Sequence, residues 1–321
     1  MLRRRFLLAA ACTPFAAICL PTASVAQPAS PTSTPPQRPR WDQPIGPTVA
    51  DEPSDYYAFE RLTFDSLDGE RHYRVYLGVP RKPAPPEGYP VIYMLDGNAA
   101  MDTLSDQDLA ELYADNPPVL VGIGYEVPSR HDVVARAFDY TPPVLNADGS
   151  VDTNIEYRGR PGGGADLFLD VIQNSIRPAI EARVQLDPTR QTLWGHSFGG
   201  LFTLYTLITR PRMFQRYVAG DPSVGREDDA LLQRAKSFHA AEAPAATVRI
   251  LVGRGRAEAP ETPVEEPVST PPPGREATFA LVNRLAEEGM DITFQAYPSQ
   301  SHGQLFATSL RPALALAAQR P

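Results

Sequence analysis

Cysteine is almost absent from this chain of 321 residues, which contains only Cys12 and Cys19. Both stand near the N-terminus, so the rest of the sequence has no thiol. A disulfide framework, a cysteine nucleophile and a thiolate metal site are therefore excluded for the body of the protein. The histidines and carboxylates do not cluster at ligand spacing either. We expect no cofactor and no catalytic metal.

Basic residues are also fewer than acidic ones. The chain has 30 Lys and Arg against 38 Asp and Glu, a formal net charge of −8. Loss of the three N-terminal arginines would make this balance more negative. A protein with this charge repels phosphate backbones, so we do not expect a nucleic-acid partner.

No stretch is long and apolar enough for a good membrane span. The apolar run at 6–20 is short and contains Pro14. It follows Arg3-Arg4-Arg5-Phe6-Leu7 and leads to small residues that end at Ala26, the order of an export signal. The pattern R-R-x-F-L predicts a Tat-type signal over 1–26, with a Sec signal or an N-terminal anchor as the alternative. We expect a periplasmic or secreted protein without a stable membrane span after cleavage.

The remaining chain divides by composition. Residues 27–54 are rich in Pro, Ser, Thr and Gln, which predicts a disordered tether. Residues 55–321 are long enough for one catalytic domain with a substantial core.

Strand and helix patterns alternate along this domain. Alternating residues around Asp68-Gly69 predict a β-hairpin, and short apolar runs predict buried strands. The long segment 126–164 has few periodic signals and is expected to be a functional or disordered loop. The whole predicts an α/β fold whose mostly parallel central sheet carries helices on both faces. The expected strands after the hairpin are 90–97, 118–125, 191–194, 215–219, 247–252 and 291–297, and the expected helices are 99–113, 165–184 (kinked at Pro178), 198–209, 227–240, 276–288 and 303–318.

One motif carries chemistry. Gly195-His196-Ser197-Phe198-Gly199 matches G-x-S-x-G and lies between an expected strand and an expected helix. In that setting Ser197 is presented on a tight corner as a nucleophile, and the Phe198 N–H at the helix start is an oxyanion donor. The alternative is a structural turn that contains a serine.

A serine nucleophile needs a base. His302 follows the last expected strand, which makes it the candidate among five histidines. The sequence leaves the third member of the catalytic set, an acid, undecided. Glu258 is the first candidate acid after strand 247–252 and Glu261 is the second, but a Ser–His dyad without an acid fits the sequence equally well.

The second oxyanion donor is expected after an early strand. The segment "YMLDGNAAMD" offers the Asn98 N–H, with Gly97 allowing a close backbone approach. The Asn98 side chain is also within the expected reach of substrate. An ordinary turn at the end of a strand is the alternative.

These segments together resemble the putative-esterase (esterase D-like) family of α/β-hydrolases. The likeness runs from about residue 57 to 318 and is specific in "VIYMLDGNAAMD", "LVGIGY", "RAFDYTPP", "LWGHSFGGLFTLYTLITRPRMFQRYVAGDPS" and "SQSHG". Within the family it is greatest for periplasmic esterases that open enterobactin-type and salmochelin-type trilactones and for the bacillibactin esterase. The resemblance implies an α/β-hydrolase fold, Ser197 as nucleophile, His302 as base, and the Asn98 and Phe198 amides as oxyanion hole. Several members carry a glutamate directly after the strand equivalent to 247–252, which this sequence lacks, and the trilactone hydrolases also lack a conventional acid.

The resemblance therefore implies a serine esterase whose small-molecule partner is a siderophore ester, either iron-free or as the ferric siderophore. An anionic iron–catecholate complex would be attracted by Arg130, Arg136 and Arg158, and Tyr125, Tyr140 and Tyr157 are candidates to stack on its rings. Surface arginines and packing tyrosines are the alternative reading. Two other functions stay open: a general carboxylesterase or acyltransferase, and a siderophore-binding protein without catalysis.

Overall fold

The computed structural model describes residues 43–146, 148–152, 154–225, 230–243, 246–255 and 267–320. The expected signal at 1–26, most of the expected tether, Glu258 and Glu261 lie outside these ranges. Residues 38–321 form one structural unit. No helix within the described part of the chain is both long and apolar enough to cross a lipid bilayer.

A sheet of eight strands organises this unit, in the order β1-β2-β4-β3-β5-β6-β7-β8. The predicted hairpin is present, because β1 pairs antiparallel with β2, and β2 pairs antiparallel with β4. All other neighbours are parallel. The expected mostly parallel α/β sheet is therefore confirmed. Its strands are β1 (Tyr57–Asp65), β2 (His72–Pro80), β3 (Tyr89–Leu95), β4 (Val119–Tyr125), β5 (Leu186–His196), β6 (Arg216–Gly220), β7 (Thr247–Gly253) and β8 (Asp291–Tyr297).

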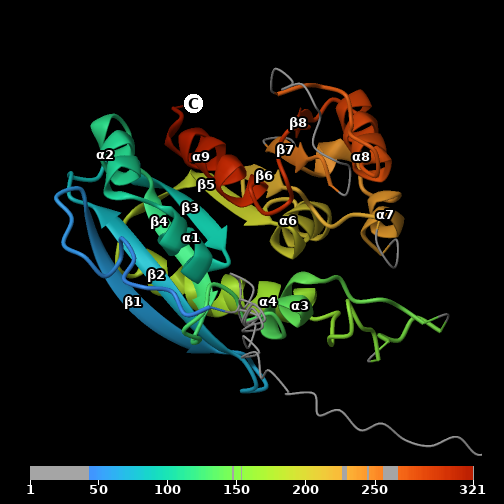
Figure 1. The fold of residues 1–321 in the computed structure, drawn as a ribbon, viewed down its shortest axis with the longest axis horizontal. Helices are drawn as coiled ribbons and strands as arrows, with labels where there is room; N and C mark the ends of the chain where they lie inside the picture. Colours follow the sequence, from blue (N-terminus) through green and yellow to red (C-terminus); the bar gives the residue numbers. More distant parts are fainter. Residues whose placement is uncertain are drawn as a thin grey trace, which may run out of the picture. The chain divides into compact units, whose positions relative to one another are not determined.

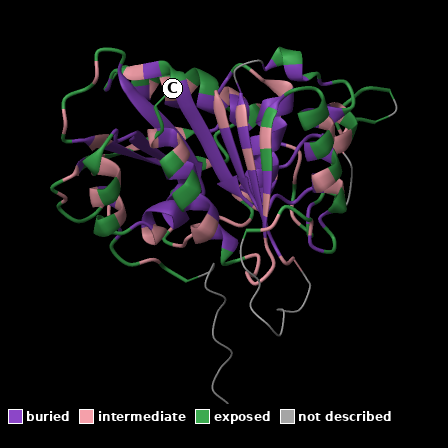
Figure 2. Ribbon diagram, turned by 90° about the horizontal axis from the view of Figure 1, so that it is seen from above, coloured by how far each residue is buried: buried purple, intermediate pink, exposed green. Residues whose placement is uncertain are grey.

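Helices cover both faces of the sheet (Figure 1). One face packs against α1 (Gly97–Thr103), α2 (Asp106–Ala114) and α9 (Leu305–Ala318). The other packs against α4 (Ala165–Val171), α6 (Phe198–Thr209) and α8 (Glu276–Glu287). The central strands are buried while exposed residues lie on the outer helices and loops (Figure 2). Strands covered on both faces need apolar residues at consecutive positions, which explains the continuous apolar runs.

Three expected elements differ in detail. The expected helix 99–113 is two helices, because the Ser105 side chain and Asp108 form a capping box that starts α2 anew. The expected helix 165–184 contains a π-helical turn (η2, Ile172–Ile176) before α5 (Arg177–Glu181), so the irregularity precedes Pro178. The segment expected as helix 227–240 includes α7 (Ala230–Ala235) and the short η3 (Ala240–Glu242).

Two predictions about loops need correction. The long loop 126–164 contains the helix α3 (Ala135–Tyr140). Residues 43–54, expected to be disordered, contact the body of the domain. Pro44 forms a β-bridge with Ser129, and the Ile45 N–H donates to the Pro128 carbonyl. Backbone hydrogen bonds of this kind fix a proline-rich segment that has no core of its own.

Candidate active site

Ser197 stands on a strained corner between β5 and α6. Its φ of 61° and ψ of −117° are unusual for a residue with a side chain, and such a backbone costs on the order of 1–3 kcal/mol. The corner is tight because a Cβ on Gly195 would lie 2.4 Å from the Gly199 carbonyl carbon. Gly195 thus permits the helix to pass directly over the strand end. The expected strand–turn–helix setting of the motif is confirmed.

The predicted base lies beside the predicted nucleophile. His302 stands in the loop between β8 and α9, and its Nε2 is 3.0 Å from the Ser197 Oγ. The ring is partly exposed, with 41% of the side-chain surface accessible. A hydroxyl at this distance from a ring nitrogen can donate its proton to it. The structure therefore brings together the two residues that the sequence had placed 105 positions apart.

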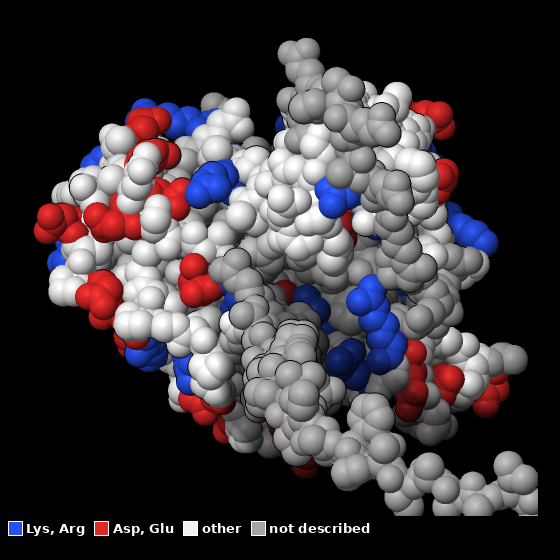
Figure 3. Space-filling view, viewed as in Figure 1, with Lys and Arg blue, Asp and Glu red and all other residues white. Residues whose placement is uncertain are grey.

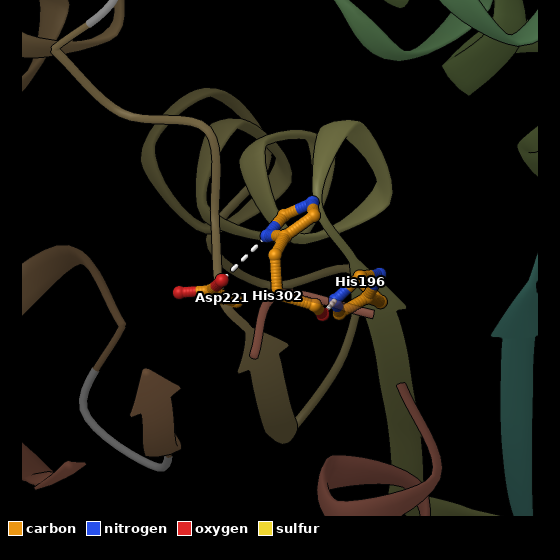
Figure 4. Close-up of side chains that lie close together, drawn as sticks. All are labelled: His196, Asp221 and His302. Carbon is orange, nitrogen blue, oxygen red and sulfur yellow. Dashed lines mark hydrogen bonds and ion pairs between the residues drawn. The ribbon is translucent and has the colours of Figure 1, made fainter. Parts of the chain in front are cut away.

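The other ring nitrogen of His302 contacts a carboxylate that the sequence analysis did not name. Asp221 follows β6, and its Oδ2 lies 2.5 Å from His302 Nδ1 (Figure 4). Because a carboxylate only accepts, Nδ1 carries the proton and Nε2 is left as the acceptor for Ser197. This contact favours Asp221 as the third member over a dyad without an acid. Glu258, the tentative acid, lies outside the described residues.

Asp221 is fixed by further contacts. Its side chain is fully buried, and its Oδ1 accepts from the Gly253 N–H and pairs with Arg275 at 2.5 Å. Burial raises the pKa of Asp221, but the hydrogen bond to His302 and the charge of Arg275 outweigh burial and hold the pKa below its ordinary value. The carboxylate is therefore ionised at neutral pH. The local signal for Asp221 is the segment "VAGDPS", which directly follows the expected strand 215–219, whereas the acid was expected after strand 247–252.

His196, inside the motif, has a positioning contact. Its ring Nε2 donates to the His302 main-chain carbonyl at 2.8 Å, and the two rings lie 4.7 Å apart (Figure 4). Burial, together with the nearby His302, lowers the pKa of His196 to about 3. The ring is therefore neutral at physiological pH and keeps the hydrogen bond that ties the His302 loop to β5.

Phe198 and Asn98 have different outcomes. Phe198 is the first residue of α6 and lines the cavity beside Ser197, so its N–H is at the expected helix start. The Asn98 side chain is buried and donates to the carbonyls of Tyr125, Val127 and Ser129. Its expected reach to substrate is wrong, because three main-chain acceptors already hold the amide. The Asn98 N–H as second oxyanion donor stays a prediction.

A cavity of about 1120 Å³ opens above Ser197 and His302. Four arginines line it: Arg130, Arg136, Arg158 and Arg160. On the face shown in Figure 3, basic side chains gather between the regions where Figure 1 places α6 and α3. The three arginines expected from the sequence, Arg130, Arg136 and Arg158, all line the cavity. Arg160 also lines it and was not among the expected residues.

Two of these arginines are paired with acids. Arg136 is held in a double hydrogen bond by Asp96, at 2.7 and 2.8 Å, and Arg130 forms an ion pair with Asp102. Burial raises the pKa of Asp96, but the Arg136 charge holds that pKa well below its ordinary value. Arg136 is thus committed to a buried ion pair, which weakens its expected role in binding substrate.

The other two arginines stand on one loop. Arg158 has a positive φ of 54° and its guanidinium lies 5.7 Å from the centre of the Phe198 ring. Among the described residues, no carboxylate lies within ion-pairing distance of Arg160. The Tyr157–Arg160 backbone hydrogen bonds close this loop beside the cavity.

The tyrosine predictions are largely wrong. Tyr140 is fully buried, and its hydroxyl accepts from the Asp96 N–H. Tyr125 is buried too and donates to Asp139. Tyr157 is buried with its ring 6.2 Å from Phe198. Large amphipathic rings fill the core here and direct their hydroxyls to internal partners, so they are not available to stack on a ligand.

Comparison with known proteins agrees with this architecture. The family described as "Putative esterase" matches residues 65–315. The apo-salmochelin esterase of Escherichia coli O6:H1 is 36% identical over 85% of this chain and 83% of its own length. The ferri-bacillibactin esterase BesA of Bacillus subtilis is 37% identical over 54% of this chain, which spans 61% of that protein.

A solved structure gives the same result. The enterobactin hydrolase IroE in complex with DFP is 34% identical, with a TM-score of 0.71, and the match covers 85% of this chain and 99% of that one. These similarities support the hydrolysis of ester bonds. The chain therefore belongs to the putative-esterase family, because these matches cover most of its length, and its sheet order with helices on both faces is the α/β-hydrolase fold.

Proposed function

We propose that this chain is a serine esterase that hydrolyses the ester bonds of a siderophore through an acyl-enzyme intermediate. The observation that carries the proposal is the continuous contact from Ser197 through His302 to Asp221, in which Ser197 and His302 line a cavity that four arginines also line. Each of the three residues follows a different strand, so the sheet fixes their separation.

The proposed chemistry follows from the proton positions. Ser197 Oγ attacks the ester carbonyl carbon while its proton passes to His302 Nε2. Asp221 accepts from Nδ1–H and stabilises the imidazolium that forms. The carbonyl oxygen becomes an oxyanion, which the Phe198 N–H and, in our prediction, the Asn98 N–H stabilise.

His302 then gives its proton to the departing alcohol oxygen, and the acyl group stays on Ser197. In the second half His302 removes a proton from water, whose oxygen attacks the acyl carbon. The bond from that carbon to Ser197 Oγ then breaks, His302 returns the proton to Oγ, and the acid is released. The roles of acid and base alternate on one nitrogen, so no metal or cofactor is required.

The substrate class is proposed from charge, volume and relatives. A ferric tris-catecholate is anionic, and arginines lining a cavity attract and orient such a ligand. The cavity of about 1120 Å³ exceeds what a simple alkyl ester needs. Two relatives in the same family act, by their names, on salmochelin and on ferri-bacillibactin.

A panel of esters tests this proposal. The purified protein is incubated with enterobactin-type trilactones, iron-free and iron-loaded, and with p-nitrophenyl butyrate, and products are read by mass spectrometry. We expect trilactone cleavage with a kcat/KM at least about 100-fold above that of the simple ester, because remote contacts in the cavity contribute binding energy in the transition state.

Three outcomes would contradict it. Rapid cleavage of the simple ester with untouched trilactones would indicate a general carboxylesterase. Preferential transfer of the acyl group to an added alcohol would indicate an acyltransferase. Tight binding of ferric siderophore without any turnover would indicate a binding protein.

We also propose that the protein is exported. The proposal rests on the N-terminal arginines and the apolar run that follows them. We expect the chain in the periplasmic fraction, shortened near Ala26, and a twin Arg3→Lys, Arg4→Lys change to hold it in the cytoplasm. Export of that variant at the normal rate would contradict the Tat part.

A further inference from the structure

The carboxylate at the end of the Ser197–His302–Asp221 contacts has a buried cationic partner. Arg275 precedes α8 as its N-cap residue, and its Nη2 lies 2.5 Å from Asp221 Oδ1. Only 6% of the Arg275 side-chain surface and none of that of Asp221 is exposed. A buried ion pair of this kind is not screened by solvent, so each charge acts strongly on the other.

The two oxygens of Asp221 have different partners. Oδ1 receives Arg275 and the Gly253 N–H, at 2.5 and 3.1 Å. Oδ2 receives only the His302 Nδ1 among the described residues. With the Gly253 N–H and the Arg275 cation at one oxygen, the carboxylate is held so that its other oxygen faces the imidazole.

The charges around His302 come from several elements. Asp221 follows β6, the neutral His196 ends β5, and Arg275 precedes α8. Arg136 acts on His196 from α3. The charges of Asp221 and Arg275 compensate each other at this end of the site.

We infer that Arg275 is a positioning residue for the reaction: it orients the Asp221 carboxylate toward His302 and offsets its negative charge. The inference rests on the proposed serine chemistry but not on the siderophore as substrate. It has one consequence for pH. An acid whose charge is offset stabilises the imidazolium less, so removal of the Arg275 charge should move the acid limb of the pH–rate profile.

Substitution of Arg275 tests the inference. Arg275→Gln keeps an amide donor and removes the charge, while Arg275→Lys keeps the charge and loses the planar fork. Hydrolysis of p-nitrophenyl butyrate is measured from pH 5 to 9. For Arg275→Gln we expect kcat to fall roughly 10-fold with KM nearly unchanged. We expect the acid limb of the kcat/KM profile to move up by about half to one pH unit, and in Arg275→Lys to stay in place.

A double-mutant comparison separates positioning from general stability. In an Asp221→Asn background we expect Arg275→Gln to change kcat by less than about twofold, because the route through the carboxylate is already lost. Arg190→Gln is the matched control, since Arg190 forms a buried ion pair with Asp187 at 2.7 Å away from the active site. It should lower the melting temperature and leave kcat and the acid limb unchanged.

The inference would be overturned by any of three results. The first is an acid limb that does not move in Arg275→Gln. The second is an equal loss of kcat in the Asp221→Asn background. The third is the same kinetic change in Arg190→Gln. A proton NMR titration of His302, assigned with His302→Ala, reads the charge effect without turnover. A midpoint unchanged by Arg275→Gln would refute the inference even if the chain proved not to be an esterase.

Discussion

Replacing Ser197 with alanine is expected to lower kcat for every ester substrate by at least about 10⁴-fold. The hydroxyl forms the bond to the acyl group in the proposed mechanism, so no other group at the corner can replace it. Alanine keeps the backbone and the volume of the site nearly unchanged, and melting temperature should stay within a few degrees. Rates are measured on p-nitrophenyl butyrate and on the preferred trilactone.

Ser223 provides a matched control for this variant. Its Oγ lies 3.4 Å from the Ser197 Oγ, but within the described part of the chain the His302 Nε2 contacts Ser197 and not Ser223. Ser223→Ala should retain activity within a fewfold and still give a pre-steady-state burst of p-nitrophenol, which Ser197→Ala should lose. An active Ser197→Ala together with an inactive Ser223→Ala would show that the nucleophile is Ser223 and not Ser197.

Replacing Asp221 with asparagine is expected to lower kcat by roughly 10²- to 10⁴-fold. An amide can donate to His302 Nδ1, which favours the tautomer with the proton on Nε2, where it cannot accept from Ser197. The change also leaves Arg275 buried without its anion, which costs about 3–5 kcal/mol of stability. Activity is therefore measured well below the melting temperature of the variant.

Glu258→Gln is the comparison that decides between the two acids. Glu258 was the candidate from sequence, while Asp221 is the carboxylate in contact with His302. We expect Glu258→Gln to retain wild-type kcat. Loss of activity in Glu258→Gln with full activity in Asp221→Asn would restore the original assignment and refute the one drawn from the structure.

Local sequence features predicted most of the fold and half of the site. The apolar runs gave the parallel strands because buried strands need apolar residues on both faces. The Ser197 corner could be predicted because G-x-S-x-G encodes its own turn: Gly195 must be glycine where the helix passes over the strand. His302 could be predicted because chain order places a base after the last strand.

The acid could not be found in the same way. Asp221 lies 81 residues before His302, and only the pairing of β6 with β5 and β7 brings the end of β6 to the imidazole. A carboxylate after either β6 or β7 can reach the same ring, and sequence alone does not say which loop turns inward. The buried pair of Asp221 with Arg275 adds a contact between a strand end and a helix start that no local pattern encodes.

The arginines illustrate the same division. Sequence identified Arg130, Arg136 and Arg158 as a basic group in one long loop, and all three line the cavity. Only the tertiary structure decided that Asp96 and Asp102 compensate two of them and that Tyr140 lies in the core. The sequence by itself determined the strands and the Ser197 corner, because both follow from neighbouring residues, and it pointed to His302 as candidate base through chain order. Charge partners are set by which strand ends and loops meet in space, so the acid and its arginine were decided by the tertiary structure alone.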